Sequence, residues 1–120
     1  MSELRVTPDA STTERYARAS GDHNPIHLDD EFARSVGLPG RILHGLYTMS
    51  LIARAQTEAF GGPASLRRLS VQFRGAALPG HEITIESTAG ERDGACVAVA
   101  ISVMQQGKAV VRGASAEVRV

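Results

Sequence analysis

The feature that most constrains the fold of this chain is a long apolar segment, which we predict to be one helix from about His44 to Phe60. Apolar residues surround almost the whole circumference of its first three turns, and charged residues enter only near its C-terminal end. The sequence Gly61-Gly62-Pro63 then ends the helix, because glycine and proline do not continue it. A helix that is apolar on every side is normally buried. The remainder of the chain must therefore wrap around this helix.

The second half of the chain supplies strands that can do the wrapping. Residues 68–74 and 82–86 alternate polar and apolar side chains, which is typical of a strand that is wet on one face. Two further strands are predicted over residues 95–104 and 109–120, separated by a turn that contains glycine. Four successive strands with short turns predict an antiparallel meander. With a first strand at residues 4–6, we expect an α+β fold in which a five-stranded antiparallel sheet wraps one long central helix.

Length and composition fit one domain over residues 1–120. The chain has 120 residues, of which 42% are hydrophobic, so a substantial core is possible. Its 13 basic and 13 acidic residues cancel, and no basic run favours nucleic acid or a membrane surface as a partner. Cys96 is the only cysteine, which excludes an internal disulfide and a thiolate metal cluster. No signal-peptide-like start or long apolar span is present, so we expect a soluble, cytoplasmic protein.

Short helices and turns are predicted between the first strand and the long helix. Residues 11–14 fit a capping box that starts a short helix, which we expect Gly21 to end. Pro25 disfavours helix at the residue before it, so a turn or extended loop should follow. A second short helix is predicted over residues 30–36, with Asp29 as its N-cap.

Asp22 and His27 flank this proline turn and form a candidate acid–base pair. An imidazole can accept a proton near neutral pH, and a nearby carboxylate can share or relay it. Asp22 as a turn residue and His27 as a packed core histidine are the alternatives. His23 and His27 have the spacing of two zinc ligands on a helix, but Pro25 excludes that helix. We therefore expect no metal here.

Gly45 falls at the first turn of the long helix, where backbone N–H groups have no partner within the helix. Such donors, together with the helix dipole, can stabilise negative charge that develops on a ligand oxygen. Glycine also lets a ligand approach the backbone closely. The alternative is that Gly45 merely packs tightly against a neighbouring strand.

Together, these residues carry a family resemblance. The run Ser-Gly-Asp-His-Asn-Pro-Ile-His-Leu-Asp over residues 20–29, then Gly37, then His44-Gly45, strongly resembles the MaoC-like dehydratase family, the (R)-specific enoyl-CoA hydratases. The motif covers about the first half of the chain, and the second half is similar only in its strand pattern. The resemblance implies the hotdog fold, a long helix wrapped by an antiparallel sheet, in agreement with the prediction above.

The resemblance also implies roles for individual residues. Asp22 and His27 become the catalytic pair, and the N–H of Gly45 becomes the oxyanion donor, in a group with Asn24 and His44. We expect Asn24 to orient the loop or bond His27, and His44 to start the helix rather than catalyse. The implied reaction is hydration of 2-enoyl thioesters, or dehydration of (R)-3-hydroxyacyl thioesters, on coenzyme A or acyl carrier protein, without a cofactor.

One residue departs from the family pattern. Some family hydratases carry a serine on the central helix that bonds the catalytic aspartate, and Ala53 occupies the position that we match to it. Ser50 is a possible substitute from one turn earlier. Arg41 and Arg67 are candidates for contact with a carrier phosphate, although a solvated arginine is the simpler interpretation.

Two other functions compete with the hydratase. A non-catalytic hotdog subunit of a heterodimeric dehydratase would not need both Asp22 and His27. A hotdog acyl thioesterase usually places a carboxylate near the central helix, where the only acidic residue here is Glu58, near the polar end. A single hotdog leaves apolar surface exposed, so we expect a homodimer or a heterodimer with another hotdog subunit.

Overall fold

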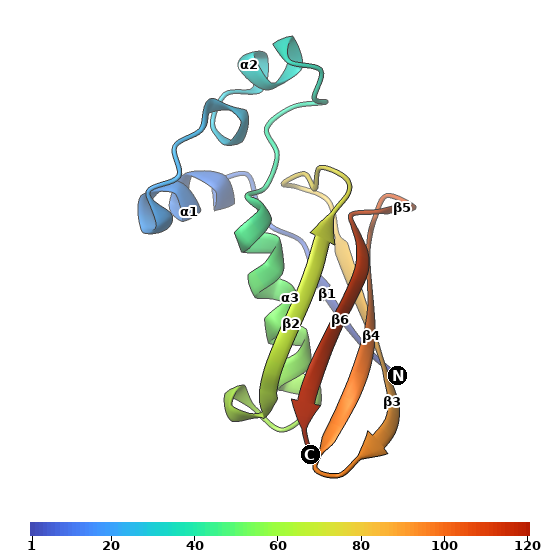
Figure 1. Cartoon of the computed structure of the whole chain (residues 1–120). Coiled ribbons are helices and arrows are strands. Elements are labelled where there is room, and N and C mark those ends of the chain that lie inside the picture. Colours follow the sequence, from blue (N-terminus) through green and yellow to red (C-terminus); the bar gives the residue numbers. More distant parts are fainter.

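Helix α3 (Gly45–Ala59) is the long apolar segment, and it lies against one face of a curved antiparallel sheet (Figure 1). The computed structural model describes residues 1–120. The other helices are short: α1 (Thr12–Ser20), α2 (Asp30–Ser35) and the 3-10 turns η1 (Pro25–His27) and η2 (Pro63–Ser65). The strands are β1 (Ser2–Val6), β2 (Leu66–Phe73), β3 (Ile83–Asp93), β4 (Cys96–Gln105), β5 (Lys108–Ala109) and β6 (Val111–Arg119).

The sheet has the strand order β1-β3-β4-β6-β2, and all of its strand pairs are antiparallel. The predicted α+β architecture is confirmed, with the two-residue strand β5 as a short addition beside β4. The predicted meander is wrong for β2, which pairs with β6 and not with β3. Because β1 and β4 already occupy both sides of β3, β2 cannot pair with β3, and it joins the sheet at the edge formed by β6.

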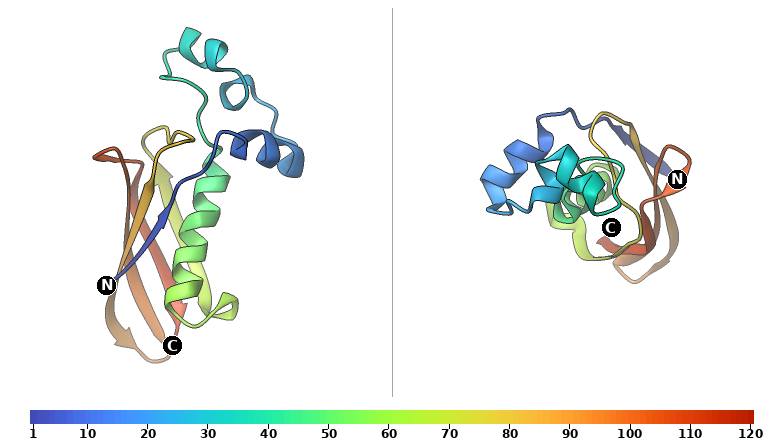
Figure 2. Two further views of the ribbon diagram at one scale, coloured as in Figure 1. Left: turned by 180° about the vertical axis from the view of Figure 1, so that it is seen from behind. Right: turned by 90° about the horizontal axis from the view of Figure 1, so that it is seen from above.

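Helix α3 is buried on one face only, so the prediction of a helix buried all round is wrong for its outer face. The face toward the sheet includes Leu51 and Ile52, which are buried, and Ile52 has no exposed surface at all. The outer face carries a stripe at every fourth residue, formed by Leu46, Ser50, Arg54 and Glu58, all of which are exposed. The sheet curves around the inner face of α3 and leaves this stripe open (Figure 2).

The core between α3 and the sheet is mostly aliphatic and contains one buried polar pair. Its least exposed aliphatic side chains come from α3 and the inner face of the sheet: Ile52, Ile83, Ile85, Val99, Val103 and Val118. Gln56 is also fully buried, and its amide nitrogen donates to the hydroxyl of Ser87 over 2.9 Å. This bond connects α3 to β3 and reduces the cost of burying both polar groups.

The short helices form an excursion above the start of α3, beyond the end of the sheet (Figure 2). Helix α1 ends at Gly21, whose φ of 81° is the left-handed conformation expected of a glycine C-cap. The predicted capping box is wrong, because the Ser11 hydroxyl does not cap α1. Instead, Asp9 accepts hydrogen bonds from the Ser11 N–H over 2.9 Å and the Ser11 hydroxyl over 2.6 Å, and the hydroxyl bond lowers the pKa of Asp9.

Asp29 is the N-cap of α2, as predicted, since its carboxylate accepts from the N–H of Phe32 over 3.1 Å. None of the helices combines the length and the apolar character that crossing a membrane would require.

Candidate active site

Asp22 lies in a loop that its own hydrogen bonds shape. The loop follows the left-handed Gly21, and the N–H of Asp22 donates to the hydroxyl of Ser20 over 3.1 Å. One carboxylate oxygen of Asp22 accepts from the N–H of Asn24 over 3.2 Å. The Asn24 side chain accepts in turn from the N–H of Ile26 over 3.2 Å and so caps η1. These local bonds orient the carboxylate while leaving the Asp22 side chain 52% exposed.

His27 is almost fully buried at the end of η1, with 7% of its surface exposed. Its Nδ1 lies 2.8 Å from the backbone oxygen of Ile42. Because a carbonyl oxygen can only accept, Nδ1 carries the hydrogen, and Nε2 of the neutral ring bears the free lone pair. Nε2 lies 3.9 Å from Oδ2 of Asp22. This distance is longer than a hydrogen bond, so both atoms remain available to a small third group.

The segment 41–43 determines where this carbonyl oxygen lies. Both the N–H and the guanidinium of Arg41 contact the Asp30 carboxylate, over 2.9 and 3.4 Å. The N–H bond is the main reason why the pKa of Asp30 is lowered, and the Arg41 charge adds to the effect. Ile42 then donates to the oxygen of Ile26 over 3.0 Å. The return segment is therefore bound to both the α2 region and the loop that carries His27.

His44 connects the loop to the start of α3. Its Nε2 lies 3.0 Å from the backbone oxygen of Asp22, and its ring stacks on that of His27 with centroids 3.9 Å apart. Tyr16 of α1 also packs on His44, with their ring centroids 4.7 Å apart. His44 occupies the N-cap position of α3, where helix initiation was predicted, but its side chain does not cap the helix.

Asp22, His27 and His44 offer ligand atoms that all lie within 4.8 Å of one another, so metal binding must be considered. The two imidazole planes differ by only 21°, and the rings stack face to face. Lone pairs in two nearly parallel planes run side by side and do not converge on one centre. One nitrogen of each ring also already faces a backbone carbonyl. The geometry favours proton exchange over metal ligation.

Gly45 is the first residue of α3. No side chain caps this end of the helix, so the first-turn N–H groups are available. Gly45 and His27 line the same cavity of about 210 Å³. A Cβ atom built on Gly45 would lie 3.2 Å from the ring of Phe73 in β2. The two predictions for Gly45, ligand approach and close packing, therefore both have a structural basis.

The sequence did not indicate several other residues of this cavity. Thr48 is buried one turn after Gly45 on α3, and Phe73 and residues 75–77 come from the end of β2 and the loop after it. A polar residue inside an apolar helix was the available signal for Thr48. For Phe73 and the loop no local signal existed, since only the folding of β2 beside α3 brings them here.

Three sequence expectations can be compared in detail with the structure. Asn24 orients the loop, and its backbone oxygen accepts a hydrogen bond from the N–H of His27 over 3.0 Å, while its side chain bonds Ile26 and not His27. Ser50 is exposed and donates to the backbone oxygen of Tyr47, so it does not support Asp22. Asp22 is not among the residues that line the cavity, and its carboxylate lies beside the cavity next to His27.

Comparison with known proteins gives a consistent result. The family model described as "MaoC like domain" matches residues 2–112. A curated relative, the peroxisomal hydratase-dehydrogenase-epimerase of Neurospora crassa, is 35% identical over 118 residues, which are 92% of this chain and 12% of the relative. The peroxisomal enoyl-CoA hydratase 2 of Arabidopsis thaliana is 38% identical over 71 residues, which are 58% of this chain and 23% of the relative. This chain thus spans less than a quarter of either curated relative.

The fold is also similar to solved structures. The unliganded R-hydratase PhaJ1 from Pseudomonas aeruginosa superposes with a TM-score of 0.88 and 28% sequence identity. The superposition covers 99% of this chain and 78% of that chain. The helix wrapped by an antiparallel sheet is therefore the hotdog fold that the motif led us to expect.

Proposed function

Because this chain belongs to the MaoC-like domain family, we propose that it adds water to 2-enoyl thioesters, or removes water from (R)-3-hydroxyacyl thioesters in the reverse direction. In this proposal residues 1–120 act as one catalytic domain. The observation that carries the proposal is the free lone pair of His27 Nε2, 3.9 Å from the Asp22 carboxylate, at a cavity that the start of α3 also lines.

The proposed mechanism assigns the proton transfers to the loop. His27 Nε2 accepts a proton from water while the water oxygen bonds to the β-carbon of the enoyl thioester. The Asp22 carboxylate stabilises the resulting imidazolium and assists return of one proton to the α-carbon. The net reaction adds one water molecule and leaves both side chains as they began. Hydrogen bonding of Nδ1 to Ile42 supports His27 as the acceptor, because it leaves Nε2 unprotonated.

The remaining site residues act on charge and position. As the water oxygen attacks, negative charge moves to the thioester oxygen, where the N–H of Gly45 stabilises it together with the positive end of α3. Asn24 and His44 hold Asp22, one through its carboxylate and one through its backbone oxygen. Thr48 lines the same cavity and offers a hydroxyl to the bound thioester.

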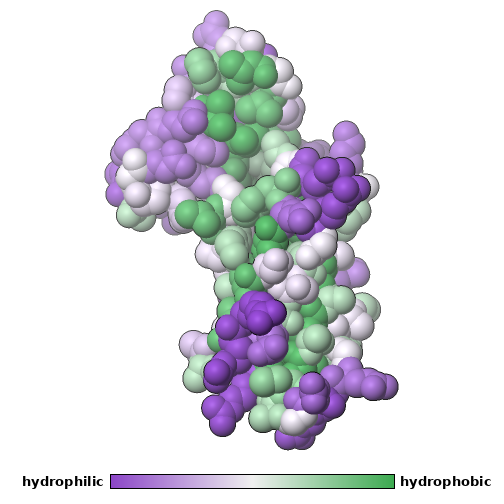
Figure 3. Space-filling view, in the orientation of Figure 1, coloured by the Kyte–Doolittle hydropathy of each residue, from purple (hydrophilic) through white to green (hydrophobic).

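The proposed assembly is a dimer, either of two identical chains or with another hotdog subunit. Leu46 follows Gly45 directly and is 65% exposed, while Phe73 is 48% exposed at the edge strand β2. Figure 3 shows further hydrophobic surface over the α2 region, where Phe32 and Val36 are exposed. A partner that covers the start of α3 and the edge strand β2 would bury Leu46 and Phe73 beside the cavity.

The test is hydration of crotonyl-CoA, followed as loss of the absorbance of the conjugated thioester. Asp22→Asn and His27→Gln are each expected to lower the rate on the order of 10²–10⁴, as for loss of an acid–base residue. His23→Gln is the matched control, because His23 is exposed on the same loop and makes no side-chain contact of this kind. Melting temperatures verify that each variant is folded.

The same assay addresses the competing functions. A thioesterase would release free thiol without hydrating the double bond. Glu58, the only acidic residue of α3, pairs with Arg54 over 2.8 Å on the exposed stripe and does not line the cavity, which argues against this activity. A non-catalytic subunit would be inactive without its partner, both with crotonyl-CoA and with long-chain enoyl thioesters. Full activity of folded Asp22→Asn and His27→Gln would contradict the proposed mechanism.

A further inference from the structure

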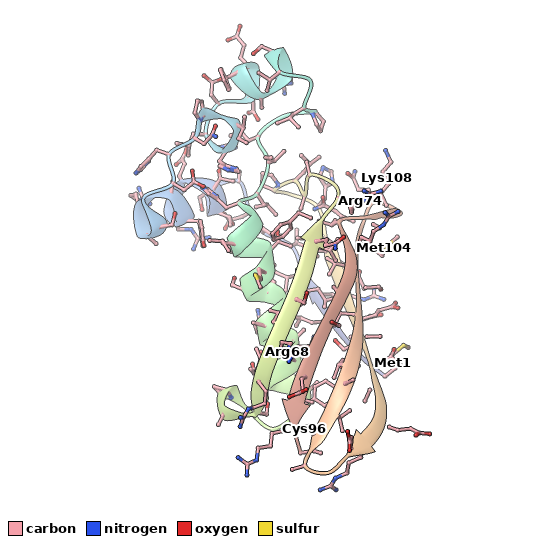
Figure 4. All side chains as sticks on the ribbon, in the orientation of Figure 1. Met1, Arg68, Arg74, Cys96, Met104 and Lys108 are labelled. Atoms are coloured by element: carbon pink, nitrogen blue, oxygen red, sulfur yellow. The ribbon has the colours of Figure 1, made fainter.

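A second and larger cavity adjoins the one that contains His27 and Gly45. It has a volume of about 680 Å³, and Gly75, Ala76 and Val110 line both cavities. Its outer wall carries Arg74, directly after β2, and Lys108 in β5. Figure 4 shows both side chains at the end of the sheet that lies next to the start of α3. The cavity of His27 and Gly45 and the cavity of the two cations are therefore neighbours that share part of their lining.

These two cations have no acidic partner. Neither Arg74 nor Lys108 takes part in a salt bridge, and no acidic residue lines the larger cavity. Both side chains are exposed. Two unpaired cations facing one hollow favour an anionic ligand, since their charges are otherwise balanced only by solvent ions.

The backbone beneath these cations is held in place. The N–H groups of Arg74 and Gly75 both donate to the oxygen of Val110, over 2.9 and 3.1 Å. Gln105 is buried and bonds both backbone groups of Leu78, each over 2.8 Å, and also the oxygen of His81. The cavity wall is therefore a fixed frame, and only the ends of Arg74 and Lys108 need to adjust to a ligand.

The other basic candidates are unsuitable. Arg41 is already paired with Asp30 and with Glu14, whose carboxylate lies 3.9 Å away. Arg67 and Arg68 stand at the beginning of β2, and Figure 4 shows Arg68 at the opposite end of the sheet from Arg74. The prediction that Arg41 or Arg67 could meet a phosphate therefore gives way to Arg74 and Lys108.

We propose that Arg74 and Lys108 bind the phosphate groups of a coenzyme A thioester whose acyl end lies in the cavity of His27 and Gly45. This inference rests on the proposed function for the identity of the acyl end. A guanidinium matches the geometry of a phosphate, and an ammonium adds a second positive charge. The volume is that of a small-ligand site, and the two cations can contact the phosphates of one small molecule.

The experiment compares a substrate that has these phosphates with one that lacks them. KM and kcat are measured for crotonyl-CoA and for crotonyl-pantetheine with wild type, Arg74→Ala, Lys108→Ala and the double variant. For crotonyl-CoA the double variant should raise KM by roughly ten-fold or more at unchanged kcat, since one charge-assisted hydrogen bond already contributes about that factor. For crotonyl-pantetheine its KM should equal that of wild type.

Arg68→Ala is the matched control, because it removes the same charge from the same segment at its far end. It should leave KM for crotonyl-CoA unchanged. Added salt should raise the wild-type KM for crotonyl-CoA and should have little effect on that of the double variant.

Several results would overturn the inference. They are an unchanged KM for crotonyl-CoA in the folded double variant, an equal rise in KM for crotonyl-pantetheine, and an equal rise in Arg68→Ala. A rise confined to a crotonyl thioester on acyl carrier protein would overturn the choice of ligand. If wild type turns over neither crotonyl substrate and also no long-chain enoyl thioester, the proposed function fails. Calorimetric binding of coenzyme A itself to wild type and the double variant then decides the anion site separately.

Discussion

Substitution of Gly45 by alanine separates the two roles that its position allows. A Cβ atom at this residue would lie 3.2 and 3.3 Å from two atoms of the Phe73 ring, closer than ordinary van der Waals contact. The same methyl group would enter a cavity of about 210 Å³ that His27 also lines. Gly45→Ala therefore disturbs both the packing on β2 and the approach of a ligand to the helix N-terminus.

The expected change in folding stability is small, because two effects oppose each other. Alanine stabilises a helix relative to glycine by at most about 1 kcal/mol, and less at its first residue. Displacement of the Phe73 ring by a few tenths of an ångström costs about 0.5–1.5 kcal/mol if its side-chain torsion must change. The ring is 48% exposed and can move outward. We expect the free energy of unfolding to change by less than about 1 kcal/mol.

The expected change in activity is much larger. If the methyl group keeps the thioester oxygen from the Gly45 N–H, kcat/KM should fall on the order of 10²-fold, as when one oxyanion donor is lost. The assay is crotonyl-CoA hydration together with denaturant unfolding of Gly45→Ala, Phe73→Leu and the double variant. Restoration of activity in the double variant would refute the argument that the methyl group blocks the N–H, since packing against Phe73 would then explain the whole defect.

Three further predictions concern the core, the α1 cap and the His44 contact. Ile52→Ala removes a side chain with no exposed surface and should lower the free energy of unfolding by about 2–5 kcal/mol in urea titration. Ile52→Val should lower the free energy of unfolding clearly less. An equal decrease in both variants would contradict the packing argument. Asp9→Ala should lower the melting temperature at neutral pH. Because the pKa of Asp9 is lowered in the folded state, this stabilisation is present above the ordinary carboxyl pKa of about 3.9 and is lost as pH falls through the folded value, so the two melting curves should converge in acid. His44→Ala should lower kcat roughly ten-fold with a smaller change in KM, because it removes the hydrogen bond to the Asp22 backbone oxygen. His44→Gln should recover part of the rate, because its amide can donate to the same oxygen. A change in KM alone would argue against a positioning role of His44.

The fold shows how far local sequence signals extend. Gly21 and Gly37 end their segments with φ of 81° and 93°. Such helix ends can be located from sequence, because the left-handed conformation of a glycine is a local property of the chain. The pairing of β2 with β6 cannot be located in this way, since the paired residues are 38 to 52 positions apart in the chain. In the same way, the apolar circumference of α3 did not indicate which side the sheet leaves open.

The candidate site likewise contains residues that local sequence signals indicate and residues that only the folded chain brings together. The proximity of Asp22 and His27 could be predicted because they lie five positions apart around a proline, and the local chain brings their side chains to 3.9 Å from each other. The capping box over residues 11–14 failed because Asp9 competes locally for the same hydroxyl, and sequence does not rank two such bonds. Arg74 and Lys108 were not identified, because 34 positions separate them and only the folded sheet joins them at one cavity.

Different segments of the chain position His27 and shape the cavity beside it. In the proposed mechanism the return segment decides which nitrogen of His27 accepts the proton, because the oxygen of Ile42 requires a hydrogen on Nδ1. That oxygen is fixed by bonds to Ile26 and, through Arg41, to Asp30, none of which lines the cavity beside His27. The cavity shape instead depends on Phe73 and the loop after it, which are anchored to Val110. Substitutions in residues 73–77 should therefore change which thioesters are accepted while leaving the pH dependence of kcat unaltered.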